Sequence, residues 1–251
     1  MTKPLASEYP QPKVKDRIIA ALDVATAAEA RSVVGELRHS VGAFKIGSQL
    51  FTAAGPELVR EFTTAGVRIF LDLKFHDIPN TVAKAAIEAA RLGVWMLNVH
   101  TLGGSSMMRQ AGDEVRAVCS GEGRERPLLI GVTVLTSSGP DDLVEAGITG
   151  DVRSAVARLA LLAAESGLDG VVASAQEASL IRETVKNPNF VIVTPGIRPF
   201  AATNNDQKRV TTFKEALEAG SDFVVIGRPL LNAADRTGVV RQMVAEAESG
   251  K

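Results

Sequence analysis

Short apolar runs and longer alanine-rich segments alternate along the chain from Arg17 onward. The apolar runs are rich in β-branched residues and end in polar residues or glycine, which is typical of buried parallel strands. They cover residues 18–24, 43–47, 67–75, 95–100, 128–135, 170–174, 190–197 and 223–227. Helical periodicity is found between them, for example at 27–37, 56–65, 81–92, 152–165, 178–185, 213–219 and 233–247. Helix ends are expected at Gly66, Gly93, Gly167 and Gly220.

Eight strand–helix units in 251 residues predict a single (β/α)8 TIM barrel, whose active site lies at the C-terminal ends of the strands. The alternative is a doubly wound open sheet. No Gly-x-Gly-x-x-Gly motif follows the first strand, which weakens that alternative. Because no low-complexity linker interrupts the chain, we expect one barrel domain over residues 17–251. A flexible, proline-containing tail is predicted over residues 1–16.

The composition of the chain argues against several classes of binding partner and cofactor. The net charge of −1 gives no bulk attraction for nucleic acid or an anionic membrane. Cys119 is the only cysteine, so no disulfide framework is possible and a reducing compartment, the cytoplasm, is expected. The three histidines lack metal-ligand spacing. No apolar run is long enough to span a bilayer, and the N-terminus lacks the apolar centre of a signal peptide.

Two charges stand at the end of the third predicted strand. Asp72 and Lys74 are two residues apart, so in a regular strand they share one face while Leu71, Leu73 and Phe75 share the other. Taken alone, such a pair is a half-exposed ion pair of little value. Asp77 follows just before a helix, and taken alone it would be the helix N-cap.

The barrel changes the meaning of these charges. Asp23 ends the first strand and Lys45 lies in the second, so charges occur late in three successive strands. Each is on the face that can look into the barrel mouth. Charges buried without partners are costly, and several independent ion pairs at one rim would be an unexplained cost in stability. The sequence therefore predicts a functional site at this rim.

The last two strands indicate a phosphate. Gly227 and Arg228 follow the eighth strand, where barrels often hold a phosphate on backbone N–H groups and a guanidinium. Residues 194–198 end the seventh strand. The segment 199–212 between them is long and polar, which favours a lid over the site.

The string Asp72-x-Lys74-x-x-Asp77-Ile78-Pro79-Asn80-Thr81 resembles the signature of bacterial-type orotidine 5'-phosphate decarboxylases. Nearly the whole chain after the tail takes part in the resemblance. Six further strings follow in the family's order, at residues 21–23, 44–47, 133–137, 194–199, 206–209 and 226–229. One departure lies in the lid, where Asn204-Asn205-Asp206 precedes Gln207 and the family often has Gly-Asp or Asp-Asp before this Gln.

The resemblance implies a carbon–carbon lyase that converts orotidine 5'-phosphate to uridine 5'-phosphate and carbon dioxide in de novo pyrimidine nucleotide synthesis, with no metal and no cofactor. Lys45, Asp72, Lys74 and Asp77 would form an alternating catalytic tetrad of cations and anions. Lys74 would stay protonated and serve as proton donor. Asp72 would lie beside the departing carboxylate.

The remaining contacts are also implied by the resemblance. Hydroxyl groups of the ribose would be held by Asp23 and Thr81, and Thr136 would read the pyrimidine edge. The phosphate would lie among Arg198, Gly227 and Arg228, with Gln207 reaching from the lid. The full set of implied substrate-binding residues is Asp23, Lys45, Asp72, Ile78, Thr81, Thr136, Arg198, Gln207, Gly227 and Arg228. Asp77 and Thr81 would enter the neighbouring subunit's site, which makes the enzyme a homodimer.

Two other functions remain open at this stage. A magnesium-dependent sugar-phosphate decarboxylase or aldolase of related fold would share Asp72, Lys74 and Asp77. Lys45 occupies the position where those enzymes place an acidic residue, and an ammonium there would repel the metal. A non-catalytic phosphate-binding barrel would not need the Lys-Asp cluster.

Overall fold

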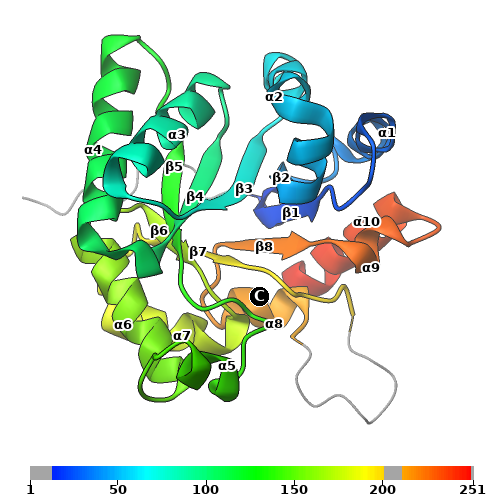
Figure 1. The fold of residues 1–251 in the computed structure, drawn as a ribbon. Helices are drawn as coiled ribbons and strands as arrows, with labels where there is room; N and C mark the ends of the chain where they lie inside the picture. The colour runs from blue at the N-terminus through cyan, green and yellow to red at the C-terminus, as the bar shows by residue number, and fades with distance from the viewer. Residues whose placement is uncertain (1–12, 201–210, 250–251) are drawn as a thin grey trace, which may run out of the picture.

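A closed barrel of parallel strands forms the centre of the computed structural model, which describes residues 13–200 and 211–249 (Figure 1). The strands are β1 (Ile18–Ala21), β2 (Ala43–Gly47), β3 (Ile69–Phe75), β4 (Met96–His100), β5 (Leu128–Val132), β6 (Gly170–Val172), β7 (Val191–Thr194) and β8 (Phe223–Ile226). Each strand pairs with the next in sequence, and β8 closes on β1. The predicted TIM barrel is confirmed.

Helices surround the strands on the outside of the barrel (Figure 1). They are α1 (Ala27–Leu37), α2 (Ser48–Thr64), α3 (Pro79–Arg91), α4 (Gly104–Gly121), α5 (Pro140–Glu145), α6 (Val152–Glu165), α7 (Ala175–Thr184), α8 (Phe213–Glu218), α9 (Arg228–Leu231) and α10 (Arg236–Glu248). Short 3-10 helices lie at η1 (Val14–Arg17) and η2 (Thr101–Gly103). The four predicted helix-ending glycines have φ between 74° and 107°, as expected.

Several predicted boundaries were wrong. Helix α2 is interrupted at Gly55 (φ 68°), so the helical segment expected from residue 56 is present and is preceded by a further helical segment that starts at Ser48. Strands β1 and β5 stop at Ala21 and Val132, before their apolar runs end. The residues that follow leave the ladder and form the loops of the barrel mouth. The structure describes no residue before Lys13, so the tail and the domain boundary at residue 17 remain predictions.

Two apolar cores are separated by the barrel wall. The larger lies between strands and helices. The smaller takes its residues from alternate positions of the strands and fills the barrel interior: Ile19, Ala21, Ala43, Phe70, Met96, Ile130, Val193 and Val225. Along β2, β3 and β4, the next inward positions after Ala43, Phe70 and Met96 belong to polar residues. The interior is therefore apolar below and polar at the carboxyl ends of the strands.

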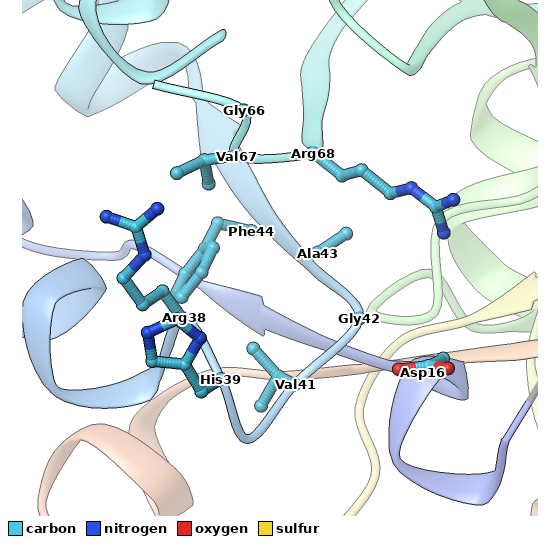
Figure 2. Close-up of a pocket in the computed structure, with 10 residues that line it drawn as sticks. All are labelled: Asp16, Arg38, His39, Val41, Gly42, Ala43, Phe44, Gly66, Val67 and Arg68. Carbon is cyan, nitrogen blue, oxygen red and sulfur yellow. The ribbon is translucent and has the colours of Figure 1, made fainter.

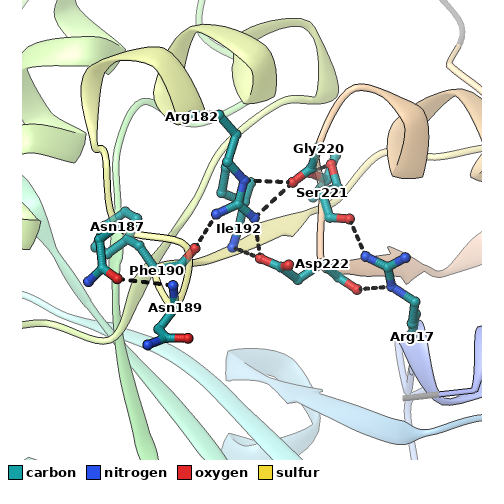
Figure 3. Close-up of polar contacts among 10 residues, drawn as sticks. Arg17, Arg182, Asn187, Asn189, Phe190, Ile192, Gly220, Ser221 and Asp222 are labelled. Atoms are coloured by element: carbon teal, nitrogen blue, oxygen red, sulfur yellow. Dashed lines mark hydrogen bonds and ion pairs between the residues drawn. The ribbon is translucent and has the colours of Figure 1, made fainter. Parts of the chain in front are cut away.

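A polar network closes the amino-terminal end of the barrel where β7, β8 and β1 meet (Figure 3). The guanidinium of Arg17 donates to the carbonyls of Ser221 and Asp222, both at 2.9 Å. The Asp222 carboxylate accepts from Arg182 and from the Ile192 N–H, the latter at 2.7 Å. These bonds tie the first strand to the last two, at the end of the barrel opposite the predicted site.

Candidate active site

Three polar side chains extend the inner face of neighbouring strands. Lys45, Asp72 and Asn98 each lie two residues beyond an interior core residue, so they point into the barrel mouth. Asn98 is fully buried, and Asp72 is 8% exposed. A strand buried on both faces is normally apolar, so this polar layer marks the carboxyl end of the barrel as the site.

Asp72 is the centre of the charge cluster. Its Oδ1 lies 2.7 Å from Lys74 Nζ, and its Oδ2 lies 3.4 Å from Lys45 Nζ. Lys45 also reaches Asp23 Oδ1 at 3.2 Å. The Lys74 side chain is 35% exposed, but those of Lys45 and Asp72 are only 12% and 11% exposed, so Asp72 belongs to a largely buried cluster and not to a lone surface pair. The structure brings together Asp23, Lys45, Asp72 and Lys74, as the sequence predicted.

The carboxyl group of Asp72 is subject to opposing effects on its pKa. Burial raises the pKa, whereas the charges of Lys45 and Lys74 and the hydrogen bonds from Lys74 and Asn98 lower it. The net result is a pKa below the ordinary value. Asp72 is therefore ionised at neutral pH despite its burial.

Lys74 does not continue the regular strand that the sequence predicted. Its φ is 51°, the only positive φ of a non-glycine residue in the described chain. Register with β4 shifts between Leu71 and Phe75, so the strand bulges at Lys74. Leu71, Leu73 and Phe75 still pack toward the outer core as expected. Simple strand alternation therefore predicted correctly that Lys74 lies beside Asp72, but it did not predict the left-handed backbone conformation of Lys74.

Asn98 was missed by the sequence interpretation. Its Nδ2 donates to Asp72 Oδ1 at 2.7 Å, and its Oδ1 accepts from the Lys74 N–H at 2.8 Å. The available signal was a polar residue inside the apolar run of β4, at a position whose side chain faces the barrel interior.

His100 follows on the same face of β4. Its Nδ1 is buried and has no hydrogen-bond partner among the described residues. Burial lowers the pKa of His100, and the charges of His76 and Lys74 lower it further.

A cavity of about 170 Å³ opens over this cluster. Lys45, Asp72 and Lys74 line it together with Thr136, one of the predicted substrate-binding residues. The remaining wall is largely apolar and comes from β3, β5, β6 and β8 and from the loops that follow β5 and β7. A small apolar chamber with a few converging charged groups is the usual form of a site for a small molecule.

Asp77 lies outside the cluster in its own chain. Its side chain is exposed and accepts a hydrogen bond from the Ile78 N–H at 2.6 Å, and no described ion pair joins it to Lys45 or Lys74. Asp77 does not cap α3, because Ile78 holds the N-cap position without a side-chain cap. Ile78 is 65% exposed, and Thr81 is exposed on the first turn of α3. One chain thus assembles three members of the predicted tetrad.

The predicted phosphate residues lie beyond the end of β8 and β7. Gly227 is next to Asp23, since a Cβ at Gly227 would stand 2.7 Å from Asp23 Oδ2. Arg228 begins α9 and is exposed. Arg198 is exposed, and its N–H donates to the Thr211 carbonyl. Gln207 and most of the predicted lid lie outside the described residues.

A larger cavity, about 360 Å³, opens at the opposite end of the barrel (Figure 2). Arg38 and Arg68 line it, but their guanidinium groups point to opposite sides. Arg38 donates to the Ala65 carbonyl at 3.3 Å, and Arg68 lies over the Trp95 ring at 5.9 Å. These cations do not converge on a common point, so the smaller cavity is the stronger candidate.

The described residues contain neither a metal-binding cluster nor a membrane span. No group of three or more His, Cys, Asp or Glu side chains among them could hold a metal ion. No described helix combines the length and apolar character needed to cross a membrane.

The fold and the site define a TIM-barrel enzyme with a buried Lys–Asp cluster at the carboxyl ends of its strands. Residues 16–243 match the model of the Orotidine 5'-phosphate decarboxylase / HUMPS family, and the chain belongs to this family. It is an enzyme of the decarboxylase class, as the resemblance implied.

Named relatives agree with this assignment over almost the full chain. Orotidine 5'-phosphate decarboxylase from Syntrophotalea carbinolica is 51% identical over 242 residues, covering 95% of this chain and 99% of the relative. The one from Moorella thermoacetica is 50% identical and covers 94% of each chain. A crystal structure of orotidine 5'-phosphate decarboxylase from Lactobacillus acidophilus superposes with a TM-score of 0.80 at 37% identity, over 92% of this chain and 98% of that one.

Proposed function

We propose that this enzyme decarboxylates orotidine 5'-phosphate to uridine 5'-phosphate without metal or cofactor, in de novo pyrimidine nucleotide synthesis, with Lys74 as proton donor. The observation that carries the proposal is the Asp72 carboxylate held between two ammonium groups at the base of a small cavity. Family membership supplies the reaction class. The charge cluster supports the roles proposed for Lys74 and Asp72.

The chemistry follows from where charge develops. Breaking the bond between the pyrimidine ring and its carboxylate releases carbon dioxide and leaves an electron pair on the ring carbon. The Lys74 ammonium stabilises this pair more than it stabilises the substrate, and then transfers a proton to it. The ionised Asp72 repels a substrate carboxylate placed ~4 Å away by about 4 kcal/mol at an effective dielectric near 20. Loss of carbon dioxide removes that repulsion.

Lys45 supports a reaction without a metal. Its ammonium lies between the carboxylates of Asp23 and Asp72, at 3.2 and 3.4 Å. A divalent cation would need several such oxygens at once, and here the ammonium already lies against both carboxylates and would repel the metal. The magnesium-dependent alternative would have to displace Lys45.

The other site residues are proposed from the family motif and from their places around the mouth. Asp23 and Thr81 would hold the ribose, and Thr136 would contact the pyrimidine. The phosphate would be bound by Arg198, Gly227 and Arg228, with Gln207 closing from the lid and Ile78 adding apolar contact. Phosphate is remote from the bond that breaks, so its binding energy can position the ring.

A homodimer with shared sites would complete the cluster. Asp77 is exposed and directed at neither lysine of its own chain, and Ile78 and Leu102 are exposed apolar residues that follow β3 and β4. A second copy packed on this rim would cover them and bring its own Asp77 toward Lys45 and Lys74.

We further propose that the barrel domain begins at residue 17, behind a flexible tail, and that the enzyme acts in the cytoplasm.

The decisive experiment is decarboxylation of orotidine 5'-phosphate in excess chelator. We expect full activity, measured by the absorbance change as the orotate ring becomes uracil. The Lys74→Ala variant, assayed in parallel, controls for uncatalysed or contaminating activity. Activity lost on chelation and restored by magnesium would instead indicate a metal-dependent sugar-phosphate enzyme.

A further inference from the structure

The backbone at Lys74 is strained, and Asn98 is positioned to hold it. A φ of 51° places Lys74 in the left-handed region, which is unfavourable for any residue with a Cβ. Such strain persists only where surrounding contacts enforce it, and it concentrates at functional sites.

Strand pairing shows which contact enforces this conformation. Leu71 pairs with Leu97 and Phe75 with Val99, so residues 72, 73 and 74 of β3 face only Asn98 of β4. Between these two pairs the ladder is interrupted. The Lys74 N–H donates instead to the Asn98 side chain at 2.8 Å. The side chain of Asn98 thus replaces a strand hydrogen bond at the bulge.

Asn98 also orients the catalytic carboxylate. Its Nδ2 donates to Asp72 Oδ1, the same oxygen that accepts from Lys74 Nζ, which leaves Oδ2 for Lys45. Both contacts require one group that donates and accepts at once, which a carboxamide does. A carboxylate in place of this carboxamide would be the wrong group, because it offers no donor and would repel Asp72 at hydrogen-bond distance.

We propose that Asn98 is a positioning residue for the decarboxylation: it fixes the Lys74 backbone and the Asp72 carboxylate in the reacting geometry without touching substrate itself. This inference rests on the proposed roles of Lys74 and Asp72. If the Asn98 side chain did no more than accept the hydrogen bond of the Lys74 N–H at the bulge, its loss would lower stability and leave turnover unchanged.

The test compares Asn98→Ala with wild type in kcat, KM and affinity for uridine 5'-phosphate. We expect kcat to fall about a hundredfold, the effect of a misplacement near 1 Å, while KM and product affinity change by less than about threefold. Product titration counts folded sites, so kcat is expressed per competent site. Should Asn98→Ala fail to fold, Asn98→Ser, which keeps a short donor and acceptor, is measured with the same expectation of a selective kcat loss.

Thr101→Val is the matched control. Thr101 is fully buried just after β4, and its hydroxyl donates to the Val132 carbonyl at 2.8 Å, away from Asp72 and Lys74. This variant and the Asn98 variants should all lose stability, but Thr101→Val should keep kcat within about twofold of wild type, because its lost bond holds neither reacting group.

A double-mutant cycle adds a readout that a structural role would not move. If Asn98 acts through Asp72, adding Asn98→Ala to Asp72→Asn should cost far less than the hundredfold expected in the wild-type background. Equal losses in both backgrounds would overturn the action proposed through Asp72, and a kcat for the Asn98 variants within about threefold of wild type would overturn the proposal as a whole. Wild-type enzyme in the same assay tests the function separately, because its inactivity would refute the proposed reaction itself.

Discussion

A shared active site can be tested by mixing two inactive variants. Lys74→Ala removes the proposed proton donor and should reduce activity by about a thousandfold or more. Asp77→Ala removes the fourth charge of the cluster and should cost at least about a hundredfold. The structure suggests that these two defects belong to different sites, because Lys74 pairs with Asp72 of its own chain at 2.7 Å whereas Asp77 pairs with neither lysine of its own chain.

The expected recovery follows from this geometry. When equal amounts of the two variants are unfolded together and refolded, about half the dimers contain one chain of each kind. In such a dimer one site collects both defects and the other has neither. Half the dimers with one good site of two give about a quarter of wild-type activity. That is well over tenfold above either parent, so a simple turnover assay detects it.

The control mixes Lys74→Ala with Asp72→Ala. Both residues act in the site of the chain that carries them, so every mixed dimer retains one defect in each site and activity should not return. Native mass spectrometry of tagged chains measures the fraction of mixed dimers. Mixed dimers of Lys74→Ala with Asp77→Ala that stay inactive would refute the reasoning and place Asp77 in its own subunit's site.

Three further outcomes are expected. Arg228→Ala should raise KM more than it lowers kcat, because a phosphate ligand is remote from the reacting carbon; steady-state kinetics with unchanged KM would remove Arg228 from the phosphate site. The pKa of Asp72 is lowered in the folded state, so its contribution to stability is present above the unfolded pKa of about 3.9 and is lost as pH falls through the folded pKa. Urea unfolding of Asp72→Asn should therefore show a smaller loss of stability below about pH 4 than wild type shows. Asp222→Ala should reduce the free energy of unfolding by about 1–3 kcal/mol, because the Ile192 N–H loses its acceptor and Arg182 loses its carboxylate partner while keeping its bonds to the Gly220 and Phe190 carbonyls; kcat should be unchanged because the network lies at the opposite end of the barrel.

The barrel could be predicted because its signal is repeated. Parallel strands buried on both faces must be continuously apolar, and helices between them must carry an apolar stripe, so eight units show the same contrast. Strand ends were less predictable. Residues such as Val24 and Val134 are apolar and β-branched, but the neighbouring strand no longer offers them a partner. A strand ends where its hydrogen-bonded neighbour ends, and this depends on two segments, whereas hydrophobicity can be read from one.

The charged part of the site was predictable for a related reason. Lys45 and Asp72 interrupt apolar runs, and a charge in such a run demands an explanation. Asn98 interrupts β4 as well, but an uncharged amide is a weaker signal. The left-handed conformation of Lys74 had no local signal at all, since lysine carries no preference for it. It results from contacts between strands β3 and β4.

These contacts also explain why the strain is placed where it is. On one side β3 keeps its register with β2 as far as Asp72, which pairs with Gly47, and on the other side it bulges away from β4. Asp72 is therefore fixed by a regular ladder while Lys74, two residues on, is turned by the bulge so that its ammonium lies 2.7 Å from the Asp72 carboxylate. Because the barrel holds this geometry without substrate, the proposed reaction would not need binding energy from the phosphate to order the two groups, and that energy would remain available to force the substrate carboxylate against Asp72.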